Sequence, residues 1–471
     1  MVFSSLTFLY IFLPVCLILY FSTKNINQKN IVLLIMSLIF YAWGEPIWII
    51  LMIVSTLVEF FGAKIVDRYR NTWKAKAAVF ISIAVSLSFL FIFKYYDFVV
   101  VNINSMAHTS IKLLGLTLPI GISFYTFQII TYIIDVYREK APVQNSFPKL
   151  LLYVSMFPQL IAGPIVKYSD VANQIEDRSF DIKKTGDGVK RFLVGLTKKA
   201  IFANLAGEVA TKFLDGNLDT LSMLGAWIGI VAYTLQIYFD FSAYSDMAIG
   251  LGKIFGFDYP ENFNHPYIAK SITDFWTRWH ISLTTFFREY LYIPLGGNRK
   301  HHVFNLLLVW LFTGLWHGAS FNFLLWGLYY YILIVSEKLF LGKLLDRIPN
   351  IFAHIYTMYM VIIGWIFFYF DDMGRLRQFL SIFFGFSGNP FMNVTDKAVL
   401  MNQILFFIIA IIATTEVPMK LKEIFLQIRE KNTFTQYTGS IVMILFFILL
   451  LFVNTAAIVG STYNPFLYFR F

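Results

Sequence analysis

The sequence is poor in charge and nearly free of cysteine. Its 471 residues are 58% hydrophobic and 14% charged, and Cys16 is the one cysteine. A lone cysteine excludes an internal disulfide and any cysteine-based zinc site. The first residues lack a charged leader and a small-residue cleavage site, so residues 1–22 are predicted to be a retained span. Long apolar runs separated by a few charges are typical of a helical membrane protein.

The basic residues lie mainly between the apolar runs, and the formal net charge is +10. In a membrane protein such an excess marks cytoplasmic loops, and no basic helix or RNA motif indicates nucleic acid. We therefore predict an all-α protein that crosses the lipid bilayer about ten to twelve times. Lys24 follows the first run and Lys431 precedes the last one, which predicts that both termini lie outside the cell.

Three segments depart from the pattern of simple spans. Residues 44–46 (Gly-Glu-Pro) form a turn signal between two apolar runs and predict a hairpin. Residues 150–166 contain two prolines and are predicted to be re-entrant. Residues 271–296 carry charges every few positions and predict an amphipathic, partly buried or interfacial helix.

A long stretch without any charged residue carries one histidine. Between Val303 and Ser336 there is no Asp, Glu, Lys or Arg, and His317 lies in its middle. The stretch exceeds the 20 or so residues that a simple span needs, so it must tilt, break or cross twice. A titratable group at that depth is costly and indicates a functional site, although a hydrogen-bonded packing role is equally compatible. Gly314 and Gly318 flank His317 and predict that the helix opens around it.

A second histidine, His280, lies one helix and a return before His317, so the two imidazoles could share a cavity. A dry aromatic site keeps an imidazole neutral, and a neutral imidazole is a general base for a hydroxyl. That chemistry suits acyl transfer from a thioester, with the second histidine or Arg278 orienting the base or stabilising the oxyanion. For His280 the neighbouring Trp276 and Trp279 favour an interfacial belt as the alternative.

Several motifs together resemble the membrane-bound O-acyltransferase (MBOAT) family, in the branch of the alginate O-acetylation membrane subunit. They cover nearly the whole chain and occur in this order: MVFSS at 1–5, PIGISFYTFQIITYIIDVYR at 119–138, FPQLIAGPIVKY at 157–168, YFDFSAYSDMAIGLG at 238–252, ENFNHPYIAKSITDFWTRWHISLTTFFREYLYIPLGGNR at 261–299, and GLWHGAS at 314–320.

The resemblance implies a single MBOAT membrane domain over residues 1–471, built as a ring of tilted helices with re-entrant segments around a central tunnel. It implies that His317 is the catalytic histidine and His280 the second, less strict one. It also implies that a cytoplasmic donor, here acetyl-CoA, and an extracytoplasmic acceptor meet in the tunnel. No permanently bound cofactor and no metal are expected.

The sequence predicts weaker roles for several other residues. Trp276, Trp279 and Trp316, with Asp240, Ser242 and Asp246, are predicted to line the tunnel, although capping or a buried polar network explains the polar ones equally well. Four basic residues could receive the phosphates of coenzyme A. They are Lys198, Lys199, Arg278 and Arg299. Positive-inside loops remain the more economical explanation of the basic clusters.

The last part of the chain, residues 458–471, is predicted to be an extracytoplasmic aromatic tail. Composition alone favours an interfacial anchor. Its sequence also resembles the C-terminal motif of the small membrane peptide of teichoic-acid D-alanylation systems, which implies Tyr468 as an acyl relay. A phenol ester is a good acyl donor, and His317 could remove the phenol's proton.

The sequence thus predicts an O-acetyltransferase that exports acetyl groups from acetyl-CoA to a partner. It shows no extracytoplasmic Ser/His/Asp domain, so a separate SGNH-type O-acetyltransferase is expected to acetylate the polysaccharide, which is peptidoglycan, a secondary wall polymer or an exopolysaccharide of a bacterium. D-alanyl transfer to teichoic acid is the alternative within enzymes. A transporter or proton pathway is the alternative of another class, but the repeats it would favour are missing.

Overall fold

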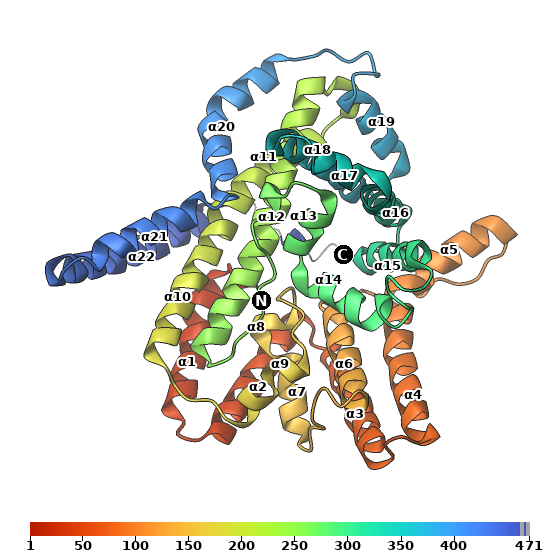
Figure 1. The fold of residues 1–471 in the computed structure, drawn as a ribbon, viewed down its shortest axis with the longest axis vertical. Coiled ribbons are helices and arrows are strands. Elements are labelled where there is room, and N and C mark those ends of the chain that lie inside the picture. The colour runs from red at the N-terminus through yellow and green to blue at the C-terminus, as the bar shows by residue number, and fades with distance from the viewer. Residues whose placement is uncertain (462–465, 468–471) are drawn as a thin grey trace. The chain divides into compact units, whose positions relative to one another are not determined.

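The computed structural model describes residues 1–461 and 466–467, and every regular element in these residues is helical (Figure 1). Within them, eight helices are long and apolar enough to cross a membrane, and three shorter apolar helices accompany them. The prediction of an all-α multi-pass protein is confirmed. The chain folds as two compact units, unit 1 (Met1–Phe192 and Tyr244–Glu261) and unit 2 (Leu193–Ala243 and Asn262–Phe471). The predicted single domain over 1–471 stays a prediction.

Unit 1 contains the first apolar runs and the polar segment that follows them. Its elements are η1 (Phe8–Phe12), α1 (Leu13–Ser22), α2 (Ile26–Gly44), α3 (Ile49–Arg68), α4 (Trp73–Leu90), η2 (Phe91–Tyr95), α5 (Tyr96–Ala107), α6 (Ile122–Tyr137), α7 (Phe147–Ser155), α8 (Phe157–Leu160), α9 (Tyr168–Glu176) and most of α10 (Ile182–Thr197). The predicted hairpin turn is confirmed, because α2 ends at Gly44 and α3 begins at Ile49. Helix α3 packs against both α4 and α6 (Figure 1).

The segment predicted to be re-entrant is broken into helices too short to span. Helix α7 has 9 residues and α8 has 4, so the longer one rises only about 14 Å of a hydrocarbon layer about 30 Å thick. Their freed backbone groups find partners inside the protein: the Tyr153 hydroxyl donates to the Val166 carbonyl at 2.8 Å, and the Gln159 amide donates to the Tyr153 carbonyl at 2.6 Å. Internal satisfaction of this kind is what permits irregular backbone at membrane depth.

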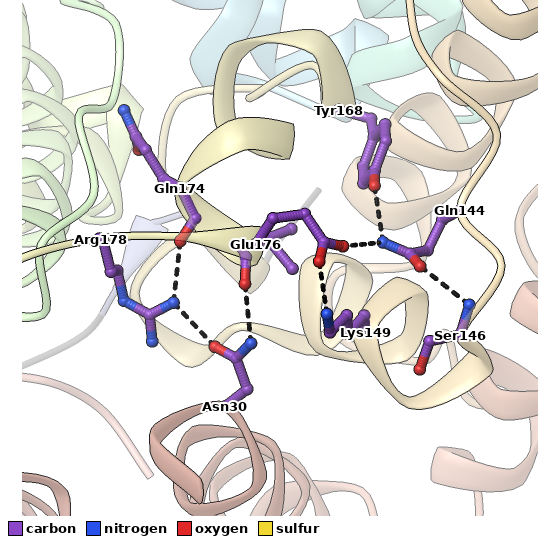
Figure 2. A network of polar contacts seen from close by, with 9 residues as sticks. Asn30, Gln144, Ser146, Lys149, Tyr168, Gln174, Glu176 and Arg178 are labelled. Carbon is purple, nitrogen blue, oxygen red and sulfur yellow. Dashed lines mark hydrogen bonds and ion pairs between the residues drawn. The ribbon is translucent and has the colours of Figure 1, made fainter. Parts of the chain in front are cut away.

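A polar network holds α9 against its neighbours in unit 1 (Figure 2). The Gln144 amide donates to the Tyr168 hydroxyl at 2.9 Å and to Glu176 at 3.0 Å, and Lys149 pairs with Glu176. Just beyond the C-terminal end of α9, Arg178 donates to Asn30 at 2.7 Å. Tyr168 is the last residue of the family-like segment 157–168. Its hydrogen bond with Gln144 gives it a structural role in unit 1.

Unit 2 contains both candidate histidines. Its elements are η3 (Lys198–Ala203), α11 (Asn204–Leu214), η4 (Leu218–Thr220), the first part of α12 (Met223–Ile254), η5 (Pro266–Ile268), α13 (Ile272–Arg278), α14 (Ile281–Phe287), η6 (Arg288–Tyr292), α15 (His302–His317), α16 (Phe321–Ser336), η7 (Glu337–Leu341), α17 (Gly342–Leu345), α18 (Asn350–Tyr369), α19 (Met373–Phe383), α20 (Val394–Ala413), α21 (Val417–Arg429) and α22 (Thr433–Gly460). Helix α12 is longer than its apolar run predicts, because the polar aromatic stretch after residue 239 continues the helix.

The expectation of one amphipathic helix over residues 271–296 is wrong. The segment forms two helical pieces, α13 and then α14, which η6 continues directly. The break lies at His280, whose backbone φ of 46° is left-handed and cannot continue a right-handed helix. The interruption is anchored from outside the segment, because the Asn264 amide donates to the carbonyl of Arg278 at 2.9 Å and the Ile281 amide donates to that of Asn262 at 2.9 Å.

The uncharged stretch forms two helices with a break between them and not one long helix, and its path through the membrane stays a prediction. Helices α15 and α16 have 16 residues each and pack closely along their lengths (Figure 1). Helix α16 packs in turn against α18. These three helices of unit 2 form the surroundings of His317.

Candidate acyl-transfer site

His317 is the last residue of α15 and is buried, with 4% of its surface exposed. Aromatic rings surround its imidazole: the ring centres of Trp316, Trp326 and Phe368 lie 4.9, 5.0 and 5.0 Å from it. The ring of Phe323 is stacked on the imidazole, with the two ring centres 6.4 Å apart. Rings contributed by α15, α16 and α18 thus enclose the histidine, in the apolar environment that the sequence predicts.

The two glycines that flank His317 permit close packing of the hairpin. A methyl group added at Gly314 would lie 2.3 Å from the carbonyl oxygen of Phe323, which is backbone on α16. One added at Gly318 would lie 2.2 Å from the ring of Phe323. Helix α15 ends at His317, and Gly318 is extended. The helix therefore terminates at the imidazole, and the glycines are required for the approach of α16.

His280 is almost fully buried, with 1% of its surface exposed. Its Nδ1 lies 3.1 Å from the side-chain oxygen of Asn262, and that oxygen also accepts from the Ser282 hydroxyl at 2.9 Å and from the Ser282 amide at 3.2 Å. An acceptor at Nδ1 selects the tautomer with its proton there, which leaves Nε2 as a lone-pair nitrogen. Burial lowers the pKa of His280 to about 3, so the ring is neutral at physiological pH.

The neutral state of His280 predicts an acid-dependent loss of stability. The folded-state pKa lies below the ordinary value of 6.5, so the unfolded chain binds the proton first as pH falls. The free energy of unfolding should therefore fall between pH 6.5 and about 3, by about 1.4 kcal/mol at about pH 5.5. In His280→Gln this part of the pH dependence should disappear, as measured by thermal unfolding in detergent at each pH. An equally steep decline in the variant would contradict the assignment.

Trp316 links the two histidines. Its ring centre lies 4.9 Å from that of His317 and 5.7 Å from that of His280. On the other side of His317, Trp326 lies 5.5 Å from Trp276. The rings of α13, α15 and α16 thus form one aromatic cluster in unit 2, and both histidines belong to it.

Trp279 extends this cluster toward α18. Its ring centre lies 4.9 Å from that of Trp365, and 3% of its surface is exposed. Trp276 and Trp279 are both buried within unit 2. These two tryptophans therefore pack inside unit 2 and are not exposed, while their depth relative to the membrane interface stays a prediction.

The polar residues of α12 have specific partners. Asp240 forms an ion pair with Lys199 at 2.7 Å, and their side chains are 2% and 5% exposed. The Lys198 amine lies 3.5 Å from the Ser242 hydroxyl. Asp246 belongs to unit 1, where it pairs with Arg191 at 2.8 Å. Their predicted place along a tunnel stays a prediction.

Three predicted residues remain, of which two are described by the structure. Arg278 pairs with Asp274 at 2.7 Å, four residues earlier on α13. Arg299 lies in the turn after η6 and its side chain is exposed. Tyr468 lies outside the described residues.

Sequence reasoning missed the residues that hold the histidines in place. Asn262 orients His280. The available signal in the sequence was that Asn262 lies in the family-like segment 261–299. Glu337 accepts from the amides of Ile272 and Thr273 at 2.6 and 2.8 Å, which caps α13. No local pattern marks Glu337, because its partners lie on a distant segment.

The model of the membrane-bound O-acyltransferase family matches residues 136–345, which include both histidines. The chain is 38% identical to the probable alginate O-acetylase AlgI of Pseudomonas putida, over the whole of both chains. It is 34% identical to the peptidoglycan O-acetyltransferase of Helicobacter pylori over 84% of this chain and 82% of that one.

A more distant relative is the teichoic acid D-alanyltransferase of Bacillus subtilis, 28% identical over 47% of this chain and 59% of that one. The O-acetylating relatives match this chain at higher identity and over more of its length than this D-alanyltransferase does, which places the chain in their branch. The aromatic histidine site of unit 2 therefore lies in an acyltransferase, and the chain belongs to the membrane-bound O-acyltransferase family, in the branch of the alginate O-acetylation membrane subunits.

Proposed function

We propose that this protein takes an acetyl group from cytoplasmic acetyl-CoA and passes it through the membrane for O-acetylation of an extracytoplasmic polysaccharide. The observation that carries the proposal is the burial of His317 among aromatic rings at the end of α15. Similarity over the whole chain to a relative named for alginate O-acetylation, and over 84% of it to one named for peptidoglycan O-acetylation, supports acetyl as the transferred group.

In the proposed step His317 acts as a general base. Its imidazole removes the proton of an acceptor hydroxyl while the hydroxyl oxygen attacks the thioester carbonyl carbon. The tetrahedral intermediate collapses, the C–S bond breaks, and the thiolate leaves with the proton from the imidazolium. The products are an acetyl ester and free coenzyme A. The aromatic enclosure limits access of water, which would otherwise hydrolyse the thioester.

We further propose that Tyr468 is the first acceptor and that both chain termini lie outside the cell. The acetyl group would then pass from the phenol ester to a serine of a separate SGNH-type O-acetyltransferase, which places it on the polysaccharide. Of the four basic residues predicted for the coenzyme A phosphates, Lys198, Arg278 and Arg299 retain that role in the proposal. Arg299 ranks first among them because its side chain is exposed. Lys199 does not retain it, because it is paired with the buried carboxylate of Asp240.

The relay predicts that Tyr468→Phe abolishes acetyl transfer. The variant keeps the aromatic ring and loses only the hydroxyl oxygen that would carry the ester. Purified protein in liposomes would be incubated with labelled acetyl-CoA and the partner transferase, and the intact mass of both proteins would be measured. We expect wild type to gain one acetyl group and Tyr468→Phe to gain none. Unchanged transfer to the partner by Tyr468→Phe would remove the relay and leave the partner's serine as the first acceptor.

A further inference from the structure

The chain after α22 returns into the interior of unit 2. Phe466 and Leu467 are buried, with 8% and 4% of their surfaces exposed. The backbone amide of Leu467 donates a hydrogen bond of 2.8 Å to the carboxylate of Asp240, in the middle of α12. An amide hydrogen bond to a buried carboxylate is among the stronger ones in proteins.

Asp240 can accept this bond because its charge is compensated. Its other oxygen lies 2.7 Å from the amine of Lys199, and both side chains are almost fully buried. Lys199 belongs to η3, a π-helical turn, and such turns are frequent at functional sites. A buried ion pair rarely adds stability over an apolar pair of similar volume. The hydrogen bond from the Leu467 amide to Asp240 gives this buried pair a role other than stability.

The end of α22 is attached to the same region of the chain. Asn454 is fully buried, and its amide donates to the Thr197 hydroxyl at 3.0 Å. Thr197 immediately precedes η3, and α22 packs against η3. In contrast, most of the remaining α22 surface is exposed. Thr197 therefore holds α22 through Asn454. Lys199 pairs with Asp240, which in turn binds the amide of Leu467.

We propose that the Lys199–Asp240 pair is the docking seat of the C-terminal segment and holds Phe466 and Leu467 in the interior of unit 2. Lys199 and Asp240 are positioning residues, since they act through the tail and not on the reacting atoms. The consequence for catalysis, presentation of the Tyr468 hydroxyl, rests on the proposed function. The docking itself does not, and can be measured separately.

A cysteine reporter measures docking without any activity. In a Cys16→Ala background, Leu467→Cys keeps the backbone amide and places a thiol at a buried position. Its rate of labelling by a small maleimide reports how often the tail leaves its seat. We expect Asp240→Ala to raise this rate about tenfold or more, because the amide loses its charged acceptor. An unchanged rate would overturn the proposal.

Two further variants separate the seat from general loosening of the fold. In Lys199→Met with Asp240→Leu, an apolar pair replaces the ion pair, so folding should be retained while labelling still rises. Asp396→Ala removes another fully buried carboxylate of unit 2, one that binds the Ser222 hydroxyl. Faster labelling only in the Asp240 variants supports the seat. An equal rise in Asp396→Ala, or slow labelling in a folded double variant, contradicts it.

Acetyl transfer then distinguishes the seat from the relay. If the Asp240 variants release the tail and lose Tyr468 acetylation, both ideas are supported. If the Asp240 variants raise the labelling rate while Tyr468→Phe retains full acetyl transfer, the acyl relay through Tyr468 is wrong. Docking of the C-terminal segment by the Lys199–Asp240 pair is then still supported.

Discussion

His317→Gln is expected to lower the rate of acetyl transfer from acetyl-CoA at least about a hundredfold, because general base catalysis typically contributes that factor or more. Glutamine is close to histidine in size and can hydrogen-bond, but it cannot take up a proton at neutral pH. The variant should therefore fold inside its aromatic enclosure while losing the chemistry. Single-turnover transfer of a labelled acetyl group, measured in liposomes, separates this effect from slow product release.

His354→Gln is the matched control. His354 also lies on a helix of unit 2, α18, and its Nδ1 is 3.1 Å from the carbonyl oxygen of Ala269. It has no proposed role, so its substitution should leave the transfer rate within about twofold of wild type, since structural effects of this size are usually modest. Full transfer by His317→Gln, or an equal loss in both variants, would show that His317 is not the base.

Hydropathy predicted most of the helices because the membrane imposes a strong constraint. Any backbone that spans lipid must satisfy its own hydrogen bonds, so apolar runs of sufficient length become helices. The turn at 44–46 and the break into short helices near the prolines of residues 150–166 were predictable from local turn chemistry. A break in the uncharged stretch was one of the predicted alternatives, and the packing of α15 on α16 depends on contacts that hydropathy does not report.

The geometry of the candidate site was less predictable. His317 was identified because a titratable residue is rare among apolar neighbours, which is a local signal. The break at His280 and its partner Asn262 depend on contacts between separate segments. The same holds for Asp240, which was predicted to line a tunnel, and whose observed partners come from η3 and from the segment after α22. Spacing along one helix carries no information about such partners.

The second large effect should come from Gly314, one turn before His317. A methyl group at this position would lie 2.3 Å from the Phe323 carbonyl oxygen, so Gly314→Ala must separate α15 from α16 or bend one of them. Overpacking of this kind costs about 1–3 kcal/mol, and the displaced imidazole should lower acetyl transfer by about a hundredfold, as misplacements near 1 Å can.

The same substitution at Gly186, on α10, meets no atom within 4 Å and replaces glycine by the better helix former. Thermal unfolding in detergent and single-turnover transfer should therefore show a loss for Gly314→Ala and no loss for Gly186→Ala. If Gly314→Ala behaves like Gly186→Ala, the hairpin contact does not position His317, and the enclosing rings of α16 and α18 must hold the imidazole by themselves.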